Sequence, residues 1–392
     1  MKVLRIIGKN LSGFTDGSID IDFTATDRVV NDTALLKLND KVYKQNIVAM
    51  IGINASGKTK TLSIVEYILK ILLNGYRLNY TKIIPYGIVD GSSFIVYFTV
   101  EDKLYKWECT LTVNEINNVR VWKYDKEVLQ EKRLSSIKTK KNIYKFPEII
   151  ADSAKYLIRN QLSNDIKEMM PDDSSITIRF SKENRAGLIS VIQSTNVNIL
   201  LPFGEIPQEI INILDDSIEY IKCEDQDDAI NCELKFKNNK NIYRLRNFAE
   251  VNNLLSSGTI KGNEVFFAAM LTLINGGYFI IDEIENHFHK ELVKLLISLF
   301  KSNNTNPNGA TIIFSTHYVE ILDIVDRKDD IYLTIRDKSN NCINIKKYSD
   351  YIKRNDLKKS ELLLSGIVKG TAPKYESIKK FKDLLWRNLQ KN

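Results

Sequence analysis

The chain carries at residues 47–59 the stretch IVAMIGINASGKT, in which five apolar residues precede a glycine-rich loop. The loop fits the pattern of a glycine, four residues and then Gly-Lys-Ser/Thr, which binds the phosphates of a nucleotide. Glycine lets the backbone fold closely around an anion, so that consecutive N–H groups and the start of the next helix face it. Residues 59–73 then have apolar side chains at helical spacing. This order of strand, loop and helix predicts an α/β fold of the P-loop NTPase class.

The loop also predicts a role for its polar residues. Lys58 is expected to reach the β- and γ-phosphates of ATP, and the Thr59 hydroxyl is expected to ligate Mg²⁺. The predicted nucleotide contacts in the loop are Gly52, Asn54, Ala55, Ser56, Gly57, Lys58 and Thr59.

A second apolar strand, at residues 277–281, ends in the two carboxylates Asp282 and Glu283. Alone, this segment would be a core strand followed by an acidic turn. In a chain that also has a phosphate-binding loop, it predicts that Asp282 holds the metal through water. Glu283 is then expected to polarise the attacking water as a general base.

Between these two motifs, Ser256, Ser257 and Gly258 precede a helix-compatible run at residues 261–273. Serines and a glycine before an apolar run are usually a helix cap. The free N–H groups and hydroxyls at such a helix start also suit a γ-phosphate. We therefore expect these three residues to contact a nucleotide on the loop of another subunit, so that ATP would join two copies.

A third apolar strand, at residues 311–315, leads to His317, which we predict to hydrogen-bond the γ-phosphate or the attacking water. His287 and His289 follow the carboxylate strand. They are two residues apart and would diverge on a helix, so we expect no zinc site there.

The composition fits a protein with acidic partners. The formal net charge of +7 favours nucleotides or nucleic acid, and the candidate nucleic-acid contacts are Lys132, Arg133 and residues 138–141. The cysteines have no metal-like spacing, so we expect thiols in a reducing cytosol. They are Cys109, Cys223, Cys232 and Cys342.

The sequence predicts a cytoplasmic protein without a membrane anchor. Its N-terminal residues lack the apolar core and cleavage site of a signal peptide. The longest apolar run, at residues 266–281, is interrupted at Asn275, Gly276 and Gly277, and it falls short of the roughly 20 residues that a membrane span needs.

Hydrophobic patterning divides the chain into four parts. An antiparallel meander is predicted over residues 94–124, and a mostly helical segment over 127–216 with one strand at 175–180. The predicted parts are the N-terminal half of the ATPase domain at 1–126, an inserted helical lid at 127–230, the C-terminal half at 231–350, and a basic helical tail at 351–392.

The order of these motifs resembles the ABC ATPase superfamily, which includes SMC and RecF proteins. The resemblance places Lys58 and Thr59 on Walker A, residues 255–259 on the ABC signature, Asp282 and Glu283 on Walker B, and His317 on the switch histidine. It implies an ABC-type head, with a mixed or parallel sheet flanked by helices and an antiparallel β subdomain. It also implies a homodimer or higher oligomer that hydrolyses ATP between subunits, with Ser256 and Gly258 acting in trans.

More narrowly, residues 282–289 (DEIENHFH) resemble the D-loop of the OLD-like ATPases, with Phe288 where leucine is usual. Residues 315–317 and 366–374 resemble the AbiL/RloA/AriA branch, standalone ATPases of bacterial anti-phage defence that are encoded beside a separate effector. This resemblance implies a sensor or regulator of a separate nuclease or toxin in abortive infection. Relatives with a nuclease add a C-terminal Toprim domain, and the Lys-rich residues after His317 have no such acidic cluster.

Three other functions fit parts of the sequence. A RecF-like DNA-repair or chromosome ATPase would bind DNA with a steep dependence on salt. The ATPase subunit of a transporter would co-fractionate with membranes. A scaffold would bind ATP without turnover, although Lys58, Asp282, Glu283 and His317 are all intact. The sequence does not assign a Q-loop glutamine.

Overall fold

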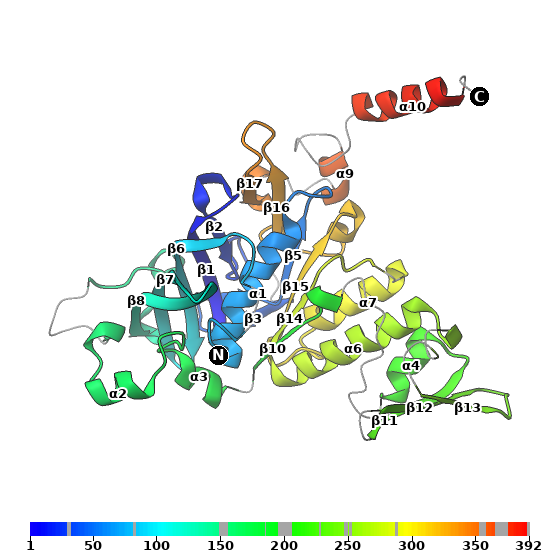
Figure 1. The fold of residues 1–392 in the computed structure, drawn as a ribbon, viewed down its shortest axis with the longest axis horizontal. Helices are drawn as coiled ribbons and strands as arrows, with labels where there is room; N and C mark the ends of the chain where they lie inside the picture. The colour runs from blue at the N-terminus through cyan, green and yellow to red at the C-terminus, as the bar shows by residue number, and fades with distance from the viewer. Residues whose placement is uncertain are drawn as a thin grey trace.

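The molecule is built around two six-stranded sheets, an antiparallel one at the left of Figure 1 and a mainly parallel one at its centre. The computed structural model describes residues 1–29, 33–80, 84–148, 156–184, 186–194, 206–226, 229–246, 250, 253–286, 289–352, 358–364 and 375–389.

The parallel sheet has the strand order β10-β14-β15-β5-β16-β17. Only the β16–β17 pair in it is antiparallel. Every residue of β5, β14 and β15 is buried, as expected for parallel strands covered on both faces. The strands predicted at residues 47–51, 277–281 and 311–315 are thereby confirmed. The sheet comprises β5 (Ile47–Ile51), β10 (Leu188–Ser190), β14 (Tyr278–Ile281), β15 (Thr311–Thr316), β16 (Ile331–Arg336) and β17 (Ile343–Lys347).

Helices cover both faces of this sheet. In β5, Val48 and Met50 pack with the helix after the phosphate-binding loop and with the antiparallel sheet. Ile47, Ala49 and Ile51 point the other way and pack with the two helices that flank β14. These helices are α1 (Lys58–Asn74) on the first face, and α6 (Ser257–Asn275) and α7 (Lys290–Lys301) on the second.

The antiparallel sheet has the order β2-β1-β6-β7-β8-β9. The predicted meander over residues 94–124 is confirmed, because β6, β7 and β8 pair as consecutive antiparallel neighbours. Its strands are β1 (Lys2–Leu11), β2 (Ile19–Asp22), β6 (Ile88–Val100), β7 (Lys103–Ile116), β8 (Val119–Arg133) and β9 (Tyr156–Ile158). A two-stranded hairpin of β3 (Leu35–Lys37) and β4 (Tyr43–Gln45) precedes β5.

A small unit of three antiparallel strands and one helix lies beyond α6 (Figure 1). Its core includes Leu255 and Ile260, which flank the Ser-Ser-Gly motif. The prediction of four thiols is wrong for Cys232, which is disulfide-bonded and lies opposite Cys223 in the strand register. Cys109 and Cys342 are free. The unit comprises α4 (Gln208–Leu214), β11 (Ile218–Gln226), β12 (Ala229–Phe236) and β13 (Ile242–Leu245).

The mostly helical lid predicted from residue 127 is wrong in its elements. Residues 127–133 continue strand β8, because Leu129 and its neighbours keep pairing with β7. The α-helices in the described part of residues 127–230 are short, and β10 belongs to the parallel sheet. Besides α4, they are α2 (Asn164–Met169) and α3 (Ile178–Glu183).

The strand predicted at residues 175–180 is also wrong. The Ser175 hydroxyl donates to the buried carboxylate of Glu127 and accepts the N–H of Thr177 at 3.1 Å. This local bond turns the chain, and α3 begins at Ile178. The β-branched residues that suggested a strand pack instead at the start of a helix.

The C-terminal tail is helical where it is described. Helix α8 (Tyr348–Tyr351) ends where the predicted tail begins, and the tail contains α9 (Lys359–Leu364) and α10 (Tyr375–Leu389). Helix α10 lies apart from the rest of the chain (Figure 1). Residues 366–374, which suggested a resemblance, lie outside the described residues. None of the helices in the described part of the chain has the length and apolarity that a membrane span requires.

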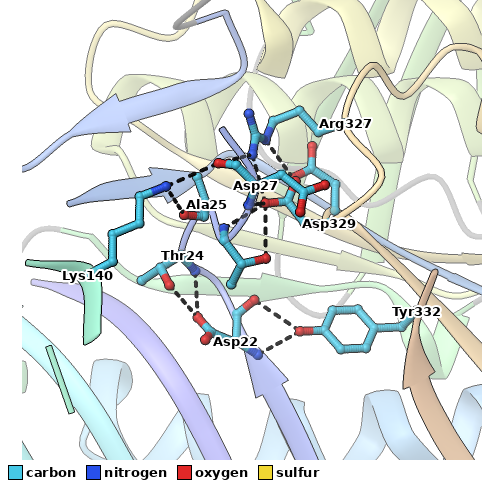
Figure 2. A network of polar contacts seen from close by, with 10 residues as sticks. Asp22, Thr24, Ala25, Asp27, Lys140, Arg327, Asp329 and Tyr332 are labelled. Carbon is cyan, nitrogen blue, oxygen red and sulfur yellow. Dashed lines mark hydrogen bonds and ion pairs between the residues drawn. The ribbon is translucent and has the colours of Figure 1, made fainter. Parts of the chain in front are cut away.

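A buried polar network ties the segment after β2 to the segment before β16 (Figure 2). One carboxylate oxygen of Asp329 accepts the N–H groups of Thr26 at 2.7 Å and Asp27 at 2.8 Å. The same oxygen pairs with Arg327 at 2.7 Å. In the same region, the backbone N–H of Asp22 donates to the Tyr332 hydroxyl at 2.7 Å. The two sheets are therefore joined by polar contacts as well as by α1.

We predict that Asp329→Asn lowers the free energy of unfolding by about 3 kcal/mol, because it leaves the partly buried Arg327 without the carboxylate that it contacts at 2.7 Å. Burial raises the pKa of Asp329, but the hydrogen bond and charge of Arg327 outweigh burial and hold the pKa below its ordinary value of 3.8. This stabilisation exists above pH 3.8 and is lost as the pH falls below it. Urea unfolding at neutral and acidic pH measures both effects.

The neighbouring Asp330→Asn is a matched control that should act in the opposite direction. Asp330 is fully buried, and neither of its carboxylate oxygens has a hydrogen-bond partner. Burial and the charge of Asp329 raise the pKa of Asp330 well above its ordinary value, so the ionised form costs stability as the pH rises. The substitution should raise the free energy of unfolding at neutral pH by about 1 kcal/mol or more. Equal effects of the two substitutions would contradict this assignment.

Candidate nucleotide site

Strands β5, β14 and β15 are parallel neighbours, so their carboxyl ends meet at one edge of the sheet. The phosphate-binding loop follows β5 at this edge and leads directly into α1. Gly57 has a φ of 105°, and a Cβ atom there would lie 2.4 Å from the Ile343 side chain of β17. A Cβ at Gly52 would lie 2.4 Å from the backbone oxygen of Thr334. Only glycine fits at these two positions, which explains the spacing of the sequence pattern.

The side chain of Lys58 is folded over the loop. Its Nζ donates to the backbone oxygens of Gly52 at 2.9 Å and Ile53 at 3.2 Å, and the residue is only 5% exposed. Burial lowers the pKa of Lys58, and the charges of Asp282, Glu283 and Glu285 oppose that shift. The Lys58 ammonium group contacts only neutral carbonyl oxygens there, so it can exchange these contacts for a charged phosphate.

Thr59 and Asp282 lie side by side, although 223 residues separate them in the sequence. The Thr59 hydroxyl donates to Oδ2 of Asp282 at 2.5 Å. A hydroxyl and a carboxylate are hard oxygen ligands of the kind that Mg²⁺ prefers. The donor set therefore fits the predicted metal, which Thr59 and Asp282 would hold.

Ser315, near the end of β15, connects the carboxylate of Asp282 to the backbone of Glu283. Its hydroxyl donates to Oδ1 of Asp282 and accepts the backbone N–H of Glu283 at 2.8 Å. No sequence motif predicts a role for Ser315. The signal that could have found it is its place at the end of a buried strand next to β14.

Glu283 begins a tight turn after β14. Its φ of 49° lies in the left-handed region, and Nδ2 of Asn286 donates to its Oε2 at 2.8 Å. The carboxylate of Glu283 is thus held in one direction at the edge where the loop lies. Asn286 is a second residue that the sequence analysis did not assign to the site.

The histidines named in the sequence analysis lie in different places in the structure. His317 follows β15 at the same edge, and its Nδ1 lies 2.9 Å from Oε1 of Glu285. His289 caps α7, where its Nδ1 accepts the N–H of Glu291 at 3.4 Å. His287 and Phe288 lie outside the described residues. Among the residues that are described, no group of three or more His, Cys, Asp or Glu could hold a metal.

Ser256, Ser257 and Gly258 lie at the start of α6. Ser256 is the N-cap of the helix, and its hydroxyl accepts the N–H of Thr259 at 3.1 Å. Ser256 and Ser257 are exposed. Among the described residues, no hydrogen bond joins either serine to the phosphate-binding loop of the same chain, so both are accessible to another molecule.

The other loop residues contribute mainly through their backbone. Ala55 has a φ of 62°, and Asn54 and Ala55 are exposed at the loop tip. Ser56 is buried, and its hydroxyl lies 2.8 Å from that of Thr334 in β16. Ser56 therefore fixes the loop against the sheet, a role that the predicted nucleotide contact did not include.

A family model described as "AAA domain, putative AbiEii toxin, Type IV TA system" matches residues 47–323, more than two thirds of the 392 residues. The chain belongs to this family. The match begins at the first residue of β5 and ends beyond β15, so the AAA domain includes the strand ends that form the site. This supports the prediction of a P-loop ATPase. A search among curated proteins finds no match.

We predict that Ser315→Ala in this AAA domain lowers ATP turnover by about 10- to 100-fold, the usual effect of removing a group that orients a metal-site ligand. ATP affinity should change little, because Lys58 and the loop are untouched. Phosphate release and titration with a fluorescent ATP analogue measure the two quantities. Ser298→Ala is the control, since Ser298 is exposed on α7. Equal turnover in both variants would remove Ser315 from the site.

Proposed function

We propose that this AAA domain is an ABC-type ATPase that binds and hydrolyses ATP between two copies and regulates a separate toxic effector in bacterial anti-phage defence. The ATPase chemistry in this proposal is supported by one observation, the continuous set of contacts from Thr59 through Asp282 and Ser315 to the backbone of Glu283. These contacts bring a phosphate-binding loop, a metal ligand set and a carboxylate base to one edge of one sheet.

In the proposed reaction, each residue at this edge has a distinct task. Bound ATP and Mg²⁺ would supply the phosphoanhydride to be cleaved and the cation that neutralises its charge. Lys58 would leave the oxygens of Gly52 and Ile53 to bind the β- and γ-phosphates. Glu283, oriented by Asn286, would accept the proton of the attacking water.

The interface between subunits is proposed from the exposed start of α6. A helix N-terminus offers free N–H groups and partial positive charge, both of which favour an anion. Because α6 packs on the sheet and leads back into β14, its start lies toward the carboxyl edge where the loop lies. Ser256, Ser257 and Gly258 would then meet the γ-phosphate held by the loop of a second copy.

The regulatory part of the proposal rests on the family description, which names a toxin of type IV toxin–antitoxin systems, and on the resemblance to defence ATPases. In this proposal, the effector contacts the small unit of β11–β13 and α4 and not the predicted helical lid. Its core contains Leu255 and Ile260 on either side of the signature. Movement of this unit would therefore reach the nucleotide interface.

The alternative of a RecF-like DNA-binding ATPase has less support in the fold. Nζ of Lys132 donates to the backbone oxygens of Asn142 at 2.8 Å and Lys145 at 2.7 Å. Lys140 donates to the oxygen of Ala25 at 2.9 Å. Two of the candidate phosphate contacts thus already stabilise the protein itself.

The first test uses Lys58→Ala and Glu283→Gln. Lys58→Ala should lose nucleotide binding, because the loop would lack its cation. Glu283→Gln should bind ATP but hydrolyse it at least about 100-fold more slowly, because it lacks the general base. It should also form an ATP-dependent dimer or higher oligomer in size-exclusion chromatography with light scattering.

Ser257→Arg in the Glu283→Gln background is the matched control for the interface. Ser257 is exposed, so the arginine should leave folding and ATP binding intact while blocking the second copy. Loss of the ATP-dependent assembly would support an interface at the signature. Turnover equal to wild type in Glu283→Gln would contradict the role of Glu283, and an unchanged assembly in Ser257→Arg would contradict the proposed interface.

The second test identifies the partner. Tagged Glu283→Gln protein, captured from its native host in the presence of ATP, should co-purify with a small nuclease or toxin, because the ATP-bound state would persist. Lys58→Ala captured in parallel is the control. Recovery of DNA with repair proteins would favour the RecF-like alternative, and recovery of integral membrane proteins would favour a transporter subunit.

A further inference from the structure

Glu285 lies in the turn between β14 and α7, three residues beyond Asp282, and is only 8% exposed. Its Oε1 accepts the backbone N–H of His317 at 2.9 Å. The same oxygen lies 2.9 Å from Nδ1 of the His317 ring. One buried carboxylate therefore contacts both the backbone and the side chain of the predicted switch histidine.

The parallel sheet determines this contact. The N–H of Ile284 donates to the backbone oxygen of Ser315 at 3.0 Å, which extends the pairing of β14 with β15 beyond the last paired residues. Glu285 consequently lies opposite His317. Because the carboxylate comes from the turn that carries Glu283, any displacement of that turn also displaces the partner of the histidine.

The contact at Nδ1 is electrostatic in character. Nδ1 of His317 and Oε2 of Glu285 have no hydrogen-bond partner, so the 2.9 Å approach to Oε1 lacks the geometry of a hydrogen bond. The ring packs edge-on against Tyr318 at 4.7 Å between centroids. With Nδ1 facing Glu285, Nε2 is the ring nitrogen available to a ligand.

We infer that Glu285 is a positioning residue for the hydrolysis reaction, which holds the His317 ring so that Nε2 faces the γ-phosphate. This inference rests on the proposed ATPase function and adds a partner for its histidine. It distinguishes Glu285 from Glu283, which acts on water, and from Asn286, which orients Glu283.

Glu285→Gln tests the inference because the amide oxygen still accepts the N–H of His317, whereas the charge opposite the ring is lost. The turnover number should fall by about 10- to 100-fold, with the KM for ATP and the melting temperature close to wild type. Glu320→Gln is the matched control, since Glu320 is exposed three residues after His317. It should hydrolyse ATP like wild type.

A double-mutant cycle with His317→Ala separates positioning from a general structural effect. If Glu285 acts through His317, the double variant should turn over ATP at the rate of His317→Ala alone, because the second substitution has nothing left to affect. Additive losses, or Glu285→Gln turnover equal to wild type, would overturn the inference. Absence of ATP hydrolysis by the wild-type protein would instead overturn the proposed function on which it depends.

Discussion

The hydrogen bond between Thr59 and Asp282 depends on the parallel pairing of β14, β15 and β5, and the rest of the site depends on this pairing too. The carboxyl ends of parallel strands lie at the same edge of the sheet, so residues that are far apart in the chain lie close together there. The hydrophobic drive to cover both faces with α1, α6 and α7 fixes the register of these strands. The polar residues at the strand ends are then so close that short side chains with a hydroxyl or a carboxylate contact one another.

Much of this arrangement could be predicted from the sequence because its determinants are local. The loop at 52–59 has its pattern because a Cβ at Gly52 or Gly57 would clash with neighbouring strands. Strand β5 was predicted at its observed bounds and β14 to within one residue, because short apolar runs with β-branched residues are typical of buried parallel strands. The family match adds an ATPase assignment that rests on the same residues.

What the sequence did not predict depends on contacts between distant segments. The prediction of a helical lid is wrong because Glu127 and its neighbours continue strand β8. Only their pairing with β7 determines that they form a strand. Ser315, Asn286 and Glu285 are ordinary polar residues in the sequence. Their places in the site follow from the strand register, which no local pattern states. The disulfide of Cys232 likewise follows from the pairing of β11 with β12.

The cap at the start of α6 has a consequence for how long two copies would stay together. Ser256 already satisfies the N–H of Thr259 within its own chain, so a phosphate that takes this position must displace an existing hydrogen bond. Losing such a cap costs about 1 kcal/mol, roughly a fivefold factor in an equilibrium constant. In the proposed pair, the cap of each copy would compete with its partner's ligand for the same donor, which would weaken the pair and favour its separation once the phosphate is cleaved.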